Sequence, residues 1–151
     1  MKRLSAVESD PAKSNQHEFN GSASLRRLLG ENDRKHIATQ FIRLDDTGEA
    51  AAAFGELSWY DARRKHPTRT EFRLYYRENL VTASMEEGDL FFLVFRKDET
   101  ALVISTSNNC GMQRELFQFF GIEEGAGCEF KYKPVTAGRV FHWTTFGESY
   151  A

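Results

Sequence analysis

The chain has 151 residues, of which 40% are hydrophobic and 28% charged, and its formal net charge is −2. This length predicts one domain with a sizeable core, and the 13 phenylalanines indicate an aromatic-rich interior. No apolar run approaches the roughly 20 residues of a membrane helix, and the cations of residues 1–5 precede no signal-peptide stretch. The composition therefore argues against a membrane partner and predicts a cytoplasmic protein.

The first half of the chain predicts short strands around one short helix. Residues 1–7 form a strand, and residues 8–21 form a polar loop, which is long for a connection inside a compact domain. Residues 24–30 form a helix with Ser22 or Ser24 as its N-cap. The strands expected after this helix cover residues 35–44, 54–60 and 70–77, whereas residues 50–53 remain ambiguous.

The second half predicts a hairpin, a helix and a last strand. The near-continuous apolar run at 90–95 is typical of a core strand, and a polar turn leads it back into a strand at 101–105. Residues 112–120 carry apolar side chains at helical spacing, which predicts a second helix packed on the core. A last strand is expected at 129–133.

These elements predict the fold class and the domain organisation. Many short strands with two short helices indicate a mainly β protein, a seven-stranded open β-barrel or pseudobarrel. The predicted domain covers residues 1–133, and residues 134–151 form a C-terminal tail or linker.

Catalytic motifs are missing from the sequence. It contains no Gly-x-Ser-x-Gly, no P-loop and no dinucleotide fingerprint. Cys110 and Cys128 lack paired metal-ligand spacing and the four histidines lie far apart, so no metal site is predicted. Glu129 and Lys131 have the Glu-x-Lys spacing of many metal-dependent nucleases, although catalysis needs another acidic residue to share the metal. A nuclease with its own active site at these residues remains an alternative.

A cation-rich segment at residues 59–74 carries the sharpest hypothesis. In an extended strand Arg69, Glu71 and Arg73 share one face, because successive side chains alternate. Arginine pairs with guanine O6 and N7, and glutamate accepts from cytosine N4. The pattern predicts sequence-specific DNA recognition, but it is also typical of an ordinary solvated strand face with cross-strand ion pairs.

The distribution of charge supports a DNA partner more than the net charge does. Residues 61–77 hold six cations and two acidic residues, whereas residues 85–129 hold nine acidic residues and three cations. One basic face and one acidic face are expected, so DNA would bind in one orientation.

Two segments resemble a known family. Residues 2–6, followed by a polar loop that ends near His17, and the pattern Tyr60…Arg63…Thr68-Arg69-x-Glu71-x-Arg73 resemble the N-terminal DNA-binding domain of the EcoRII-type restriction endonucleases. That domain shares a pseudobarrel fold with plant transcription-factor domains of the auxin-response kind. The resemblance implies two arms that grip duplex DNA and read its major groove: an N-arm at 8–18 and a C-arm at 60–73.

The resemblance also implies roles for individual residues. Base edges would be read by Asp10, Asn15, His17, Arg69, Glu71 and Arg73. We assign the DNA phosphates to Lys13, Arg63, Arg64, Lys65 and Thr68. The target would be a short G·C-containing site.

The family further implies a partner domain. This domain would be non-catalytic and need no cofactor, and a separate nuclease domain of the same type II restriction enzyme would need Mg²⁺ in a prokaryotic cytoplasm. A protein-interaction barrel that uses exposed aromatic side chains is the remaining alternative.

Overall fold

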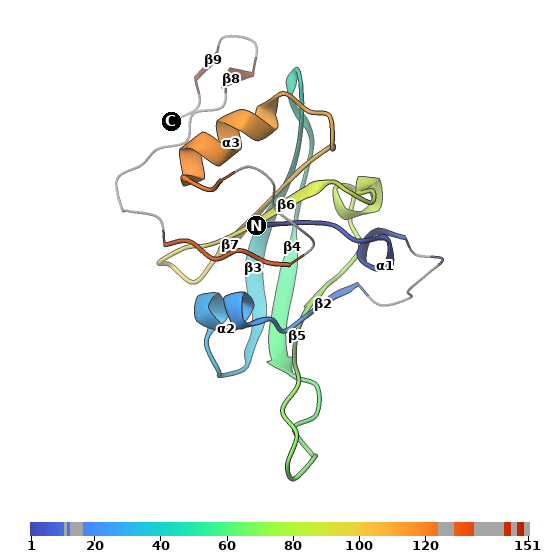
Figure 1. Ribbon diagram of the computed structural model, residues 1–151, viewed down its shortest axis with the longest axis vertical. Helices are drawn as coiled ribbons and strands as arrows, with labels where there is room; N and C mark the ends of the chain where they lie inside the picture. The colour runs from blue at the N-terminus through green and yellow to red at the C-terminus, as the bar shows by residue number, and fades with distance from the viewer. Residues whose placement is uncertain (11, 13–16, 124–128, 135–143, 146–147, 150–151) are drawn as a thin grey trace.

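A computed structural model describes residues 1–10, 12, 17–123, 129–134, 144–145 and 148–149. Seven of the strands in this part of the chain form one sheet, in the order β1-β6-β7-β3-β4-β5-β2, which curves into a half-barrel (Figure 1). The prediction of a mainly β, seven-stranded open barrel is confirmed.

The bounds of the elements are as follows. The strands of the sheet are β1 (Lys2–Arg3), β2 (Glu18–Asn20), β3 (Arg34–Asp45), β4 (Gly48–Asp61), β5 (Phe72–Tyr76), β6 (Leu90–Phe95) and β7 (Ala101–Thr106). The helices are α1 (Ala6–Ser9), α2 (Ala23–Leu29) and α3 (Met112–Phe120), with a 3₁₀ turn η1 (Thr82–Ser84). A separate pair of short strands is formed by β8 (Thr144–Thr145) and β9 (Glu148–Ser149).

The long β3–β4 hairpin lies in the middle of the sheet. β3 pairs with β4 antiparallel and with β7 parallel, and the other ladders of the sheet are antiparallel. β5 pairs with the end of β4, and the three-residue strand β2 pairs with β5 at the edge of the sheet. The two segments that were expected to form arms therefore meet at this edge.

Alternating side chains divide the core between the two faces of the sheet. Phe91 and Val103 join a cluster with Leu25 and Leu29 of α2 on one face. Their neighbours Phe92 and Ile104 join a second cluster with Leu116, Phe117 and Phe120 of α3 on the other face. Because successive strand residues point to opposite faces, a strand covered on both sides is apolar throughout, as β6 is and as β7 is from Ala101 to Ile104.

Four sequence-based expectations about elements were wrong. The strand expected at 1–7 ends at Arg3, because residues 6–9 form the short helix α1, in which the Glu8 carboxylate accepts the backbone N–H of Ser5 at 2.9 Å. The loop expected at 8–21 contains strand β2. The described residues form three α-helices instead of the expected two, and the expected strand at 129–133 is not a strand. There Lys131 and Met1 exchange two backbone hydrogen bonds, Lys131 N–H to the Met1 carbonyl at 2.8 Å and the Met1 ammonium to the Lys131 carbonyl at 3.0 Å, so the segment is held against the start of the chain without forming a strand.

The ambiguous residues 50–53 are part of β4. None of the helices among the described residues is long and apolar enough to cross a membrane.

Candidate functional site

The β4–β5 connection, residues 62–71, extends from the body of the half-barrel (Figure 1). Its base is closed by Asp61, whose Oδ1 accepts the N–H of Arg63 and the N–H of Glu71, both at 2.9 Å. Ala62 also donates its N–H to the carbonyl of Glu71 at 2.8 Å. The two hydrogen bonds to its carboxylate, from Glu71 first and then from Arg63, hold the pKa of Asp61 below its usual range. The loop therefore has a fixed base and an exposed tip.

A hollow of about 550 Å³ lies where the loop joins the edge of the sheet. It brings together four of the predicted site residues, His17 from the N-arm and Arg63, Glu71 and Arg73 from the C-arm. The other residues that line it are Glu18, Ala62, Tyr75 and Tyr76.

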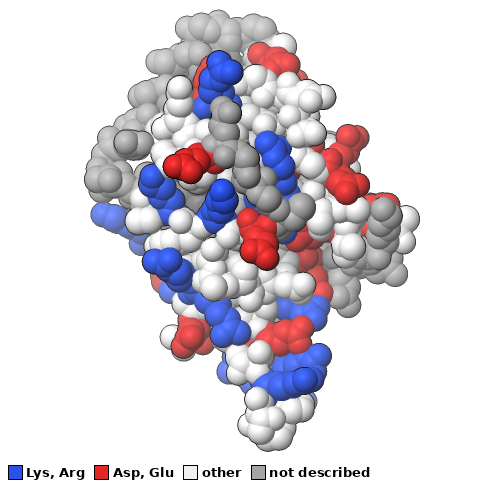
Figure 2. All heavy atoms as spheres, viewed as in Figure 1, with Lys and Arg blue, Asp and Glu red and all other residues white. Residues whose placement is uncertain are grey.

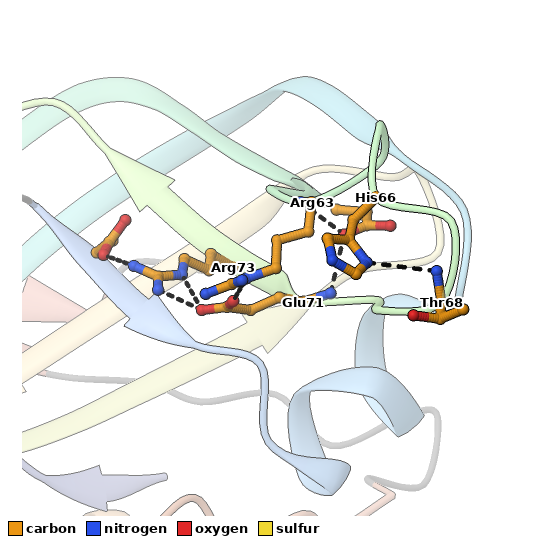
Figure 3. A network of polar contacts seen from close by, with 7 residues as sticks. Arg63, His66, Thr68, Glu71 and Arg73 are labelled. Carbon is orange, nitrogen blue, oxygen red and sulfur yellow. Dashed lines mark hydrogen bonds and ion pairs between the residues drawn. The ribbon is translucent and has the colours of Figure 1, made fainter.

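Two arginines and two carboxylates form a continuous network in this hollow (Figure 3). Arg63 donates Nε–H to Glu71 Oε2, and Arg73 donates Nε–H to Glu71 Oε1 at 3.0 Å. The Nη1 group of Arg73 donates to Glu18 Oε1 on β2. The Arg73 side chain is 24% exposed and that of Glu18 is 11% exposed, so solvent screens this pair less than it screens the loop cations. Arg73 could contact a base only after at least one of these ion pairs breaks.

The network fixes the charge states of its members. Hydrogen bonds from Arg73 and then from Arg63 hold the pKa of Glu71 below its usual range. The same hydrogen bond to Glu71 raises the pKa of Arg73. Glu71 is therefore ionised near neutral pH, as an acceptor for a cytosine amino group would need to be.

An aromatic pair continues the same strand face. Tyr75 of β5 stacks on Tyr60 of β4, with ring centroids 4.6 Å apart and an interplanar angle of 12°. The ammonium of Lys35 lies 5.6 Å from the Tyr60 ring centroid. Burial raises the pKa of Tyr75, with smaller contributions from hydrogen bonding to Tyr60 and from the Glu18 charge. This polar–aromatic face could hold a planar, electron-poor group.

The cations on the loop fall into two classes. Arg64 donates to Asp33, which precedes β3, and is thereby held by the body of the protein. Lys65 and Arg69 are exposed and have no hydrogen-bond or ion-pair partner within the described residues. Thr68 is exposed as well, and its N–H donates to Nδ1 of His66 at 3.3 Å. Figure 2 shows Lys and Arg side chains gathered just above the tip of this loop.

Arg69 does not lie where the sequence placed it. β5 begins at Phe72, so Arg69 belongs to the loop and does not share a strand face with Glu71 and Arg73. Pro67 and the Asp61 bonds to the loop base favour a turn over a continued strand. The alternation does hold from Phe72 onwards, because Phe72 and Leu74 are buried while Arg73 is half-buried.

The N-arm is only partly described. His17 packs against Tyr76, with ring centroids 5.4 Å apart, and its Nε2 lies 3.7 Å from Glu78 Oε2. Asp10 ends α1 and accepts the N–H of Ala12 at 2.9 Å, and it does not line the hollow. Lys13 and Asn15 lie outside the described residues. Of the N-arm residues predicted to read bases, the structure thus brings His17 to the C-arm, and the neighbouring Glu18 joins it there.

The residues of the nuclease alternative lie elsewhere. Glu129 and Lys131 are exposed, and neither lines the hollow. In the described part of the chain, no three or more His, Cys, Asp or Glu side chains are grouped so that they could hold a metal ion. A second cleft, of about 300 Å³, is lined mainly by apolar residues of α2, β6 and the segment 130–134.

Sequence reasoning missed three members of the site. Tyr75 continues the alternation of Glu71 and Arg73, so that pattern carried a signal for it. Glu18 is the last residue of the expected N-arm, but no local pattern pairs it with Arg73, which is 55 residues away. Asp33 is likewise 31 residues from Arg64.

No protein-family model, curated protein or solved structure matches the chain.

Proposed function

We propose that this chain is a sequence-specific recognition domain for double-stranded DNA. The observation that carries the proposal is the β4–β5 loop, whose exposed cations Lys65 and Arg69 have no partner within the described residues. Between Asp61 and Glu71 the loop contains four cations and no acidic residue. Such a projecting cationic element attracts the phosphate backbone.

The shape of the element also supports a DNA partner. The major groove is about 12 Å wide and admits a two-stranded β-ribbon. The pairing of β4 with β5 continues beyond the edge strand β2 through the hydrogen bond from Ala62 N–H to the Glu71 carbonyl, so the base of the projecting loop is such a ribbon. Entry of this ribbon would place the hollow, with His17 and Glu71, near the mouth of the groove.

The contacts would divide between phosphates and bases. Lys65 and Arg64 would contact phosphates, and Arg63 engages Glu71 in the protein through Nε alone, which leaves its terminal nitrogens for a phosphate. Arg69 would read a guanine, because a free guanidinium can donate two parallel hydrogen bonds to O6 and N7. Glu71, with Arg73 behind it, would accept from a cytosine amino group.

The wider setting belongs to the same proposal. The domain would target a separate, Mg²⁺-dependent nuclease domain of a type II restriction enzyme to a short G·C-containing site. The resemblance of residues 2–6 and 60–73 to the DNA-binding domain of EcoRII-type enzymes supports this part.

A selection from random duplexes tests the proposal. The purified chain is incubated with a randomised duplex library at moderate salt, and the bound fraction is amplified and sequenced. One enriched, G·C-containing motif is expected. The matched control is the Arg63→Ala, Lys65→Ala, Arg69→Ala triple variant, which should enrich nothing. Failure of the wild-type chain to enrich any motif would refute the proposal and favour a protein-interaction role.

A further inference from the structure

We propose that Glu18 is a positioning residue that couples the two arms through Arg73 and sets the orientation of Glu71. This inference deepens the proposed function and rests on it for the part that concerns DNA. Glu18 does not contact DNA in this proposal. It acts on Arg73, which in turn holds Glu71, the carboxylate that would read a base.

The first argument is the place of Glu18 in the sheet. It lies on β2 opposite Tyr75, and Arg73 is opposite Asn20, so Glu18 and Arg73 are diagonal neighbours across the two strands. Side chains at such positions reach one another when they are long and share a face. The ion pair therefore follows from the register of β2 on β5.

The second argument is the position of β2 at the edge of the sheet. It is three residues long and forms the edge of the sheet, where β5 is its only partner strand among the described residues. On each side of it one backbone bond extends the ladder: Tyr76 N–H to His17 O at 3.0 Å and Gly21 N–H to Phe72 O at 2.8 Å. A Cβ at Gly21 would lie 2.3 Å from Phe72 O, so this close approach requires glycine. Phe19 anchors the buried side of this strand, since it is 1% exposed and packs against Phe91 and Phe130, and the Glu18–Arg73 ion pair joins the opposite face of the strand to β5.

The third argument is the geometry of Arg73. One guanidinium engages Glu18 through Nη1 and Glu71 through Nε and Nη2. Because the planar Arg73 guanidinium is bound along two edges, its orientation is fixed. The Glu71 carboxylate that it binds is thereby held in one orientation as well. Removal of Glu18 would leave Arg73 tethered through Glu71 alone, and Arg63 would then be the one remaining fixed partner of the Glu71 carboxylate within this network.

The test compares Glu18→Gln with Glu99→Gln. Both variants remove one negative charge from an ion pair. Glu99, however, lies in the β6–β7 turn and pairs with Arg34 of β3, away from the hollow. A third variant, Arg73→Lys, keeps the charge and loses the fork, so it should reproduce the effect of Glu18→Gln. Circular dichroism establishes that each variant is folded.

The first measurement uses no DNA. Amide hydrogen exchange is followed by NMR at Ala62 and Glu71, whose N–H groups close the base of the loop. Glu18→Gln and Arg73→Lys should raise exchange there about tenfold relative to β7 amides, and Glu99→Gln should not. Unchanged exchange in Glu18→Gln would overturn the coupling, whether or not the chain binds DNA.

The second measurement uses the enriched duplex and a scrambled duplex of the same composition. Glu18→Gln should lower the ratio of the two affinities about tenfold. If Glu18 acted only through its negative charge, Glu18→Gln would raise the affinities for both duplexes equally and leave their ratio unchanged. That result would overturn the positioning role. A wild-type chain that binds neither duplex would instead refute the proposed function and leave the exchange result as the measure of the coupling.

Discussion

Replacing Lys65 by alanine separates a phosphate contact from a base contact. Lys65 is exposed on the β4–β5 loop and has no partner among the described residues, so the substitution should not disturb the fold. Its ammonium is a point charge that would neutralise one phosphate and release the counterions condensed there. The expected effect is weaker binding to every duplex, with the order of preference among sequences retained.

The size of the effect follows from counterion release. Each neutralised phosphate contributes about 0.9 to the slope of log affinity against log salt. With Arg63, Arg64 and Lys65 on phosphates, the wild-type slope would be about −2.7, and Lys65→Ala would make it about 0.9 shallower. Between about 50 and 200 mM salt, the affinity ratio of wild type to variant should then shrink about 3.5-fold.

The assay is fluorescence anisotropy with a labelled duplex at four or more salt concentrations. Lys97→Ala is the matched control, because Lys97 is an exposed lysine in the β6–β7 turn. Equal slopes for wild type and Lys65→Ala would refute the phosphate contact. If Lys97→Ala made the slope as shallow as Lys65→Ala does, the change in slope would be due to the net charge of the protein and not to the loop.

Three further predictions test the base contact and the fold. Arg69→Ala should flatten the preference among duplexes, with a loss of about 1–3 kcal/mol of discrimination at one base pair in a repeat of the selection; an unchanged motif would show that Arg69 reads no base. Trp59→Phe should lower the free energy of unfolding in urea by about 1–3 kcal/mol, because Trp59 is fully buried and its Nε1–H donates to the Gly30 carbonyl at 2.9 Å; a loss well below that range would mean that water replaces the bond. Burial, and then the charges of Glu8 and Glu78, raise the pKa of Tyr76 to about 12, so its contribution to stability is complete below its ordinary pKa of 10 and is lost as the pH rises to about 12. Tyr76→Phe should therefore unfold with a shallower dependence on pH between 10 and 12 than wild type, and equal dependences would contradict the shift.

The sequence by itself determined the elements that depend on local periodicity. β6 and α3 have the bounds that their apolar patterns predict, and Ser22 caps α2 by accepting the N–H of Leu25 at 3.2 Å. Apolar patterning acts over a few neighbouring residues, so it can be followed along the chain without knowing the fold. The cationic nature of the β4–β5 loop and the alternation of Arg73 with its buried neighbours were available in the same way.

Only the tertiary structure decided what the candidate site contains. Strand β2 is too short to be predicted from its own three residues, and it exists as a strand because β5 supplies its hydrogen-bond partners. The pairing of β2 with β5 then brings Glu18 to Arg73 across 55 residues of sequence, and the pairing of β3 with β4 brings Asp33 to Arg64 across 31. A charge pattern shows which side chains a segment carries, but whether each cation is paired or free depends on what distant segments place beside it. For that reason Arg69 and Lys65 have no partner in the described part of the chain and Arg73 is engaged, although the three cations look alike in the sequence.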